Sequence, residues 1–313
     1  MKPLAFRAEA GLLTKGVEDM ELWFLYAIGA AIFAGLTTVL AKIGLKDVDS
    51  HLATAIRTMV VVAFLWIIVF AVGSQDGIWR MDGTTWIVLI LSGLATGGAW
   101  LCRFRALKFG NVNKVTPITK SSTILTMLLA FIFLREPLGW ITIVAMVLMG
   151  TGTWMMLELK KTKKSGDVEK NPRKSWIIFA VLAAVFASLV AIFGSIGVSD
   201  MDASLWTAIR TVIVALLSWL MVYATGGQKE IKKIKIKSWV FLVLSGLATG
   251  ASWLFFYHAL QIGNASLVVP IDQLSIVITM GFARLFLGER FSKQSLIGLA
   301  ILTIGILLPV FAT

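Results

Sequence analysis

Two ionisable residues lie inside long apolar segments, at related places in the sequence. Lys120 follows Pro117-Ile118-Thr119, and Asp272 follows Pro270-Ile271. An ammonium group can bind an anion, whereas a carboxylate can bind an amine or carry a proton. The alternative is that each side chain snorkels to its nearest membrane interface. We expect Pro117 and Pro270 to stand at helix starts, where a missing N–H costs nothing. If those helices begin inside a membrane, both charges move toward its centre.

Further candidates occupy matching positions in the two halves of the chain. These residues are Arg57 and Arg210, Arg105 and His258, Trp100 and Trp253, and Tyr257, which matches Phe104. An arginine can pair with an anionic group or snorkel, and a tryptophan can stack on a ligand or anchor the chain at an interface. Two carboxylates, Glu136 and Glu289, fall in short turns near helix starts, where a negative charge stabilises the helix. We interpret these two as structural.

The matching positions reflect a tandem duplication. The segment LSGLATGGAWL, from Leu91 to Leu101, returns as LSGLATGASWL from Leu244 to Leu254, 153 positions later. The same offset relates TAIRT at 54–58 to TAIRT at 207–211. The chain is therefore two copies of a unit of about 140 residues, much longer than soluble solenoid repeats.

The composition places this unit in a membrane. Hydrophobic residues make up 58% of the chain and charged residues 15%, with a mean hydropathy of +0.87, whereas a soluble domain is nearer half apolar and a quarter charged. Gly93-x-x-x-Gly97 and its copy at Gly246 and Gly250 are typical of helices that pack closely in lipid. The single cysteine, Cys102, excludes an internal disulfide and a multi-cysteine metal site. We expect no cofactor and no metal.

Ten apolar segments are long enough to cross a bilayer, which needs about 20 residues each. They cover Leu22–Ile43, Leu52–Val72, Trp86–Phe104, Val115–Leu134, Leu138–Leu157, Trp176–Gly197, Leu205–Ala224, Trp239–Tyr257, Leu267–Leu287 and Ser295–Val310. The sequence thus predicts an all-α integral membrane protein with five helices in each repeat. We expect residues 1–20 to be a leader or a mis-assigned start, residues 21–159 and 175–313 to be the two repeats, and residues 160–174 to be a basic linker.

The distribution of positive charge predicts the orientation of the helices. Of the 29 Lys and Arg residues, 21 fall on the side of the 160–174 linker, five fall on the opposite side and three lie inside spans. Cytoplasmic loops carry the excess of Lys and Arg, so the linker is expected in the cytoplasm and both termini outside. An odd number of helices per repeat makes the two copies enter the membrane from opposite sides, as inverted-topology repeats do.

The ordered motifs resemble a known family. LSGLATG, then Gly-Asn at 110–111, Pro-Ile at 117–118, a Leu-x-Glu turn and a glycine-rich last helix occur in both halves. This pattern is similar to the EamA-type units of the drug/metabolite transporter superfamily. The resemblance implies two inverted five-helix repeats and metabolite efflux or exchange through a central cavity. Ten-helix members are generally described with cytoplasmic termini, opposite to the charge distribution of this chain. Single-unit relatives often open the fourth helix with Pro-Ile-Asp-Lys, of which Lys120 and Asp272 would be the divided remnants.

Several classes of function are excluded or remain as alternatives. The chain has no metalloprotease, phosphate-loop, dinucleotide or serine-hydrolase motif, so we do not expect an enzyme. The leading interpretation is a secondary transporter of a small polar metabolite in the inner (cytoplasmic) membrane, with a coupling proton as a second candidate partner. Nucleic acid is not an expected partner, and fusion of the halves favours a monomer. The alternatives are a lipid or lipid-linked-sugar translocase and a non-transporting scaffold subunit.

Overall fold

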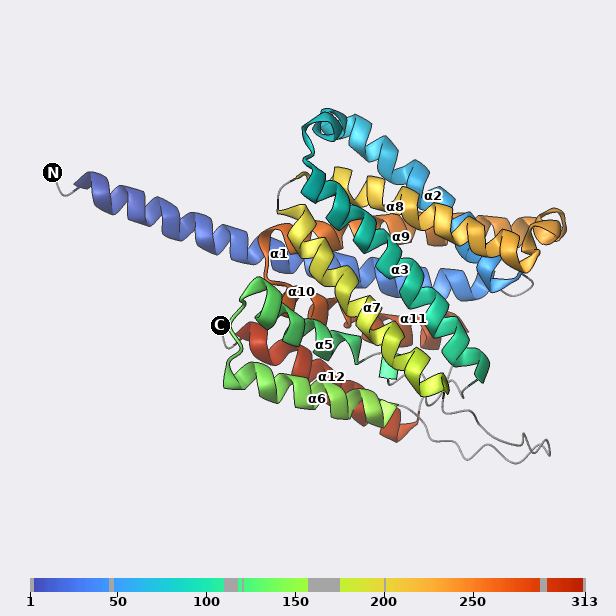
Figure 1. The fold of residues 1–313 in the computed structure, drawn as a ribbon. Helices are drawn as coiled ribbons and strands as arrows, with labels where there is room; N and C mark the ends of the chain where they lie inside the picture. Colours follow the sequence, from blue (N-terminus) through green and yellow to red (C-terminus); the bar gives the residue numbers. More distant parts are fainter. Residues whose placement is uncertain are drawn as a thin grey trace.

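In a computed structural model of the chain, the described residues are 3–44, 48–109, 118–119, 121–156, 175–199, 201–287 and 292–311. Their regular structure is helical throughout (Figure 1). The first half contains α1 (Pro3–Gly44), α2 (Ser50–Val72), η2 (Ser74–Arg80), α3 (Gly83–Phe109), α5 (Ser122–Leu129), η3 (Ala130–Leu134) and α6 (Trp140–Met156). The second half contains α7 (Ser175–Val198), α8 (Ala203–Thr225), η4 (Gly227–Lys233), α9 (Ile236–Ile262), α10 (Ala265–Asp272), α11 (Ser275–Leu287) and α12 (Lys293–Phe311).

Eight helical segments within the described residues are long and apolar enough to cross a membrane. Two shorter apolar segments, Ser122–Leu134 and Trp140–Met156, occupy the positions of the fourth and fifth predicted spans. The outside of the bundle carries large apolar side chains: Leu25 is 63% exposed, and Leu216 is 68% exposed. Such a continuous apolar surface would aggregate in water, whereas lipid tails cover it. The chain is therefore a multi-pass membrane protein.

The first helix is longer than the span that it contains. α1 is continuous from Pro3 to Gly44, and its membrane window covers Leu22–Ala41. Its N-terminal part projects away from the bundle (Figure 1). The segment 3–20 is thus helical. Its assignment as a leader or mis-assigned start stays a prediction.

Aspartates cap three helix starts. Asp49 accepts hydrogen bonds from the backbone N–H groups of the first turn of α2, and Asp202, its counterpart 153 positions later, does the same for α8. Asp82 accepts from the backbone N–H of Thr85 at 2.8 Å and from its hydroxyl at 2.5 Å, ahead of α3. These bonds from Thr85 hold the pKa of Asp82 below its usual value. Capping satisfies N–H groups that the helix itself leaves unpaired.

The two halves pack against each other through contacts that repeat at the 153-residue offset. A Cβ added to Gly152 would lie 2.7 Å from the carbonyl oxygen of Gly298, and one added to Gly305 would lie 3.0 Å from the carbonyl oxygen of Ala145. Because 145 and 152 in α6 meet 305 and 298 in α12, the two helices run antiparallel, side by side in Figure 1. The same close contact is therefore made twice.

Helices α1 and α9 are also antiparallel. The Ser245 hydroxyl donates to the Thr37 carbonyl at 3.1 Å, and the Ser252 hydroxyl donates to the Ala30 carbonyl at 3.0 Å. These hydrogen bonds join α9 to α1 across the two repeats. The image of this pair, α3 on α7, forms the other side of the molecule (Figure 1).

The repeated glycines pack as their spacing predicts. A Cβ on Gly93 of α3 would lie 2.6 Å from the Ile213 side chain of α8, and one on Gly246 of α9 would lie 2.7 Å from the Val60 side chain of α2. Only a residue without a side chain allows this approach. The interpretation of LSGLATG as a packing face is confirmed.

Candidate functional site

A cavity of about 360 Å³ lies between the two repeats, and we call it the inter-repeat cavity. Its charged lining residues are Arg103, Arg210 and Asp272. Its remaining lining residues are Ala34, Thr96, Ala99, Trp100, Thr119, Ser122, Ala183, Ala187, Val190, Ser252, Trp253, Phe256, Tyr257 and Gln273. Helices from both halves thus contribute to one chamber that holds cations, a carboxylate and aromatic rings.

Arg210 is the most firmly held of these charges. It lies on α8 and is only 3% exposed. Its Nε donates to the Ser92 hydroxyl at 3.0 Å, and its Nη2 donates to the Thr96 hydroxyl at 2.6 Å. The guanidinium also lies 5.3 Å from the ring centres of both Trp253 and Tyr257. Hydrogen bonds and cation–π contacts offset the cost of burying the charge.

Arg57, the counterpart of Arg210, lines a second cavity of about 300 Å³, which we call the Arg57 cavity. Its Nη2 donates to the Thr249 hydroxyl at 2.9 Å, the image of the bond from Arg210 to Thr96. Both threonine hydroxyls donate onward to carbonyls one helical turn earlier in their own helices. The arginine of each repeat is therefore bound to the third helix of the other repeat.

The two cavities are neighbours. Trp100, Arg103 and Trp253 line both of them. The other residues that line the Arg57 cavity are Thr54, Thr58, Val61 and Thr249. The side chain of Arg103 is exposed on α3, where it faces both chambers. The structure thus brings three arginines and two tryptophans into one connected region.

Asp272 lies where a helix breaks. α10 ends at Asp272, and α11 begins at Ser275 after a turn. Pro270 lies inside α10, two residues before this end, so the prediction that Pro270 stands at a helix start is wrong. A proline in the last turn lacks the N–H that would continue the backbone ladder and clashes with the preceding turn. Discontinuous helices place backbone polar groups at membrane depth where they line a cavity.

Glu136 explains why this helix begins earlier than predicted. Its two carboxylate oxygens accept from the backbone N–H groups of Ala265 at 2.7 Å and Ser266 at 2.8 Å, in the first turn of α10. The backbone of Arg135 is in the left-handed region, with φ at 56°. It ends η3 and turns the chain, so that Glu136 follows directly after the turn. A buried carboxylate from the first repeat therefore caps a helix of the second. Its structural interpretation is confirmed, while Glu289 lies outside the described residues.

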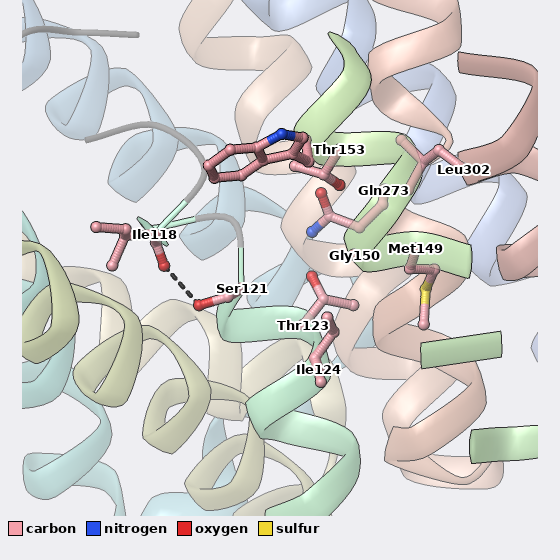
Figure 2. Close-up of a pocket in the computed structure, with 10 residues that line it drawn as sticks. Ile118, Ser121, Thr123, Ile124, Met149, Gly150, Thr153, Gln273 and Leu302 are labelled. Atoms are coloured by element: carbon pink, nitrogen blue, oxygen red, sulfur yellow. Dashed lines mark hydrogen bonds between the residues drawn. The ribbon is translucent and has the colours of Figure 1, made fainter. Parts of the chain in front are cut away.

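A third cavity, of about 270 Å³, adjoins the inter-repeat cavity (Figure 2). Gln273, in the turn between α10 and α11, lines both. Figure 2 shows the Gln273 amide between the side chains of Thr153 and Thr123, and the Ser121 hydroxyl donating to the Ile118 carbonyl at 2.6 Å. The helix break therefore sits at the meeting point of two chambers.

The predicted site residues divide into those that line one of the two cavities, those that line neither and one that lies outside the described residues. The inter-repeat cavity is lined by Arg210, Trp100, Trp253, Tyr257 and Asp272. The Arg57 cavity is lined by Arg57 and shares both tryptophans.

Arg105 and His258 line neither cavity. Arg105 is exposed, with its guanidinium 5.5 Å from the ring centre of Phe179. The His258 Nε2 lies 3.3 Å from the Ser204 hydroxyl, and its ring stacks on Tyr26 at 5.4 Å. Lys120 and Pro117 lie outside the described residues, so the role of Lys120 and the helix start at Pro117 stay predictions.

Sequence reasoning missed the partners of the arginines. Ser92 and Thr96 stand in LSGLATG, one helical turn apart, and hydroxyls at that spacing on a repeated helix were a usable signal. Arg103 gave no such signal, because Phe256 replaces it in the second copy and it falls at the end of a predicted span. Among the described residues, no group of three or more His, Cys, Asp or Glu side chains could hold a metal ion.

Comparison with known proteins adds three findings. The model of the EamA-like transporter family matches residues 21–158 and again residues 174–311. An uncharacterized transporter in cobO 3'region of Sinorhizobium sp is 43% identical over 135 residues, which are 43% of this chain and 96% of that protein. An uncharacterized protein of Methanocaldococcus jannaschii is 30% identical over 133 residues, 42% of this chain and 93% of that protein.

A crystal structure of a protein with 17% sequence identity shares the fold, with a TM-score of 0.75 over 93% of this chain and 96% of that one. Each of the two sequence relatives is matched by less than half of this chain over nearly its full length. Both relatives therefore have about the length of a single repeat.

Proposed function

Since the chain belongs to the EamA-like transporter family and is a membrane transporter, we propose that it is a secondary transporter of a small polar metabolite. It exports or exchanges its substrate by alternating access through the inter-repeat cavity. The single observation that carries this proposal is that one polar chamber is built from both repeats, with Arg210 on α8, Asp272 on α10 and Arg103 on α3 in its lining. A chamber at a repeat interface can open to either side when the repeats rock.

Ten helices in two inverted repeats form the architecture of this proposal. The antiparallel packing of α6 on its equivalent helix α12 supports it, because an inverted repeat turns equivalent helices to opposite directions. The antiparallel packing of α9 on α1 agrees, because α9 is the equivalent of α3 and not of α1, and in an inverted repeat the third helix of one copy runs opposite to the first helix of the other. The excess of Lys and Arg on the side of the 160–174 linker supports a cytoplasmic linker and a place in the cell membrane. Fusion of the two repeats favours a monomer.

The dimensions of the cavity favour a small metabolite over a lipid. A chamber of about 360 Å³ is at the lower end of the range for small-molecule sites. Arg103, Arg210 and Asp272 offer charges that recognise a polar molecule. A lipid or lipid-linked-sugar translocase would need a longer apolar groove, and a scaffold subunit would need no polar chamber.

The first test is a ligand screen. The purified protein is heated with amines, carboxylates, phosphate esters and sugars, and the apparent melting temperature is recorded. A ligand that binds the folded state raises this temperature by mass action. Protein reconstituted in vesicles must then move the same ligand, and absence of any movement would contradict transport.

Asp272 gives the first mutational prediction. We expect Asp272→Asn to abolish accumulation of the ligand against a gradient and to leave membrane insertion intact, because a half-buried carboxylate inside a span binds a coupling proton or a substrate amine. Lys120→Gln is expected mainly to weaken affinity for the substrate. Uptake into vesicles with an imposed pH gradient measures both effects. Wild-type accumulation by the Asp272→Asn protein would show that the carboxylate is not needed.

A further inference from the structure

The internal symmetry of the protein fails at one hydrogen bond. Arg210 donates through both Nε and Nη2, to Ser92 and Thr96. Arg57 repeats the Nη2 bond, to Thr249, but its Nε is buried and has no hydrogen-bond partner among the described residues. The serine equivalent to Ser92 is Ser245, so the second repeat does carry the hydroxyl that would complete the pair.

Packing between the repeats diverts that hydroxyl. Ser245 donates to the Thr37 carbonyl of α1 at 3.1 Å, which orients the side chain toward the neighbouring helix. The Arg57 Nε is left without an acceptor in the part of the chain that the structure describes, although an unsatisfied buried donor is costly and one on a charged group is costlier still. The Arg57 side chain lines the adjoining cavity, so a small rotation of the guanidinium would bring this donor to an acceptor that enters the cavity.

The Arg57 cavity favours an anion as that acceptor. Arg57 and Arg103 both line it, and its described lining residues include no carboxylate. The hydroxyls of Thr54 and Thr58 donate to backbone carbonyls of their own helix, so they offer no proton to the cavity. The available donors of this chamber are therefore mainly guanidinium N–H groups, whose planar fork matches carboxylate and phosphate oxygens.

We propose that Arg57 and Arg103 form an oxyanion subsite, which binds a carboxylate or phosphate group of the transported molecule. This inference rests on the proposed transport function and assigns the chemistry of one end of the substrate. Asp272 lines the inter-repeat cavity but not the Arg57 cavity. Arg103, Trp100 and Trp253 face both cavities, so a molecule can place its anionic group at Arg57 and extend between the tryptophans toward Asp272. Arg210, which donates to two protein hydroxyls, also holds α8 against α3.

Binding of simple anions to the full-length protein in detergent tests the subsite. The melting temperature is titrated with sodium phosphate and, separately, with sodium acetate, with sodium chloride keeping the ionic strength constant. We expect at least one of the two anions to raise it with saturation, and the anion that does so identifies the phosphate or carboxylate class. Arg57→Gln and Arg103→Gln should each weaken the apparent affinity at least about tenfold, since each removes a charge-assisted hydrogen bond.

Three further variants make the result specific. Arg57→Lys keeps the charge but not the fork, so it should weaken binding less than Arg57→Gln. Arg284→Gln, an exposed arginine on α11 outside both cavities, should titrate like the wild type. Asp272→Asn should keep the response to the anion. If Arg57→Gln fails to fold, Arg103→Gln and Arg57→Lys carry the test.

Two results would overturn the subsite. One is a wild-type protein that shows no saturable response to either anion. The other is an Arg57→Gln or Arg103→Gln protein that titrates like the wild type. Failure of transport is distinguishable, because the titration needs no movement of ligand. A protein that binds anions but moves nothing would refute the transporter, and one that transports normally without Arg57 would refute the subsite.

Discussion

At the scale of single residues, identity and position do not determine what a side chain does. Arg57 and Arg210 stand in the same pentapeptide, TAIRT, yet Arg210 is 3% exposed with two hydroxyl acceptors and two aromatic rings, while the Arg57 Nε has no acceptor among the described residues. The difference arises from neighbours on other helices. We infer that after the duplication Arg210 became a structural anchor, whereas Arg57 kept an N–H group that no described residue accepts.

This difference predicts unequal effects on stability. Arg210→Gln should lower the free energy of unfolding by about 2–3 kcal/mol, because it removes two charged hydrogen bonds and two cation–π contacts from a buried position. Arg57→Gln removes one such hydrogen bond, the bond to Thr249, and should cost about 1 kcal/mol. Thermal denaturation of both variants in the same detergent measures the difference. Equal losses would contradict the assignment of Arg210 as the anchor.

At the scale of helices, sequence patterns located the elements well but missed where one of them breaks. Apolar length alone placed α2, α7, α8 and α12 within a few residues of their observed ends. The start of α10 depends on Glu136, which lies 129 residues away in sequence, so no local pattern contains it. Arg103 likewise had no counterpart in the second copy to mark it. The start of α10 and the place of Arg103 depend on contacts between distant segments, which the periodicity of the sequence does not contain.

The Glu136 cap predicts a graded loss. Glu136→Ala should destabilise the protein by about 1–2 kcal/mol, because two N–H groups of α10 lose their acceptor and the helix start loses a favourable charge. Glu136→Gln keeps one acceptor oxygen and should cost less. Melting temperature, together with accumulation of ligand per folded molecule, measures stability and transport separately. An Ala variant as stable as the wild type would show that the N–H groups find another acceptor.

At the scale of the whole molecule, the orientation in the membrane is predicted from the distribution of charge. Most of the Lys and Arg residues lie on the side of the 160–174 linker, and no solved contact is needed to derive that bias. The antiparallel pairs α6–α12 and α1–α9 agree with repeats of opposite direction. The orientation itself stays a prediction.

Labelling of lysines on intact cells tests this orientation. A membrane-impermeant reagent should leave the linker lysines, such as Lys160 and Lys174, unmodified until the cells are opened, because the linker is expected in the cytoplasm. Strong labelling of the linker in intact cells would reverse the orientation and leave the helical fold unaffected. Lys2 and Lys15, which precede the first span, are expected to react without opening the cells.

The hydrogen bonds between repeats also determine the order in which the protein can be completed during its synthesis. Thr37 and Thr249 touch across 212 residues, and Arg57 waits for an acceptor 192 residues further along the chain. At a translation rate of about 5–20 residues per second, this interval lasts roughly 10–40 s. For that time Arg57 lacks its acceptor Thr249, which only the second repeat supplies. A fused gene limits the delay to the time of elongation, whereas two separate half-length chains would have to meet by diffusion.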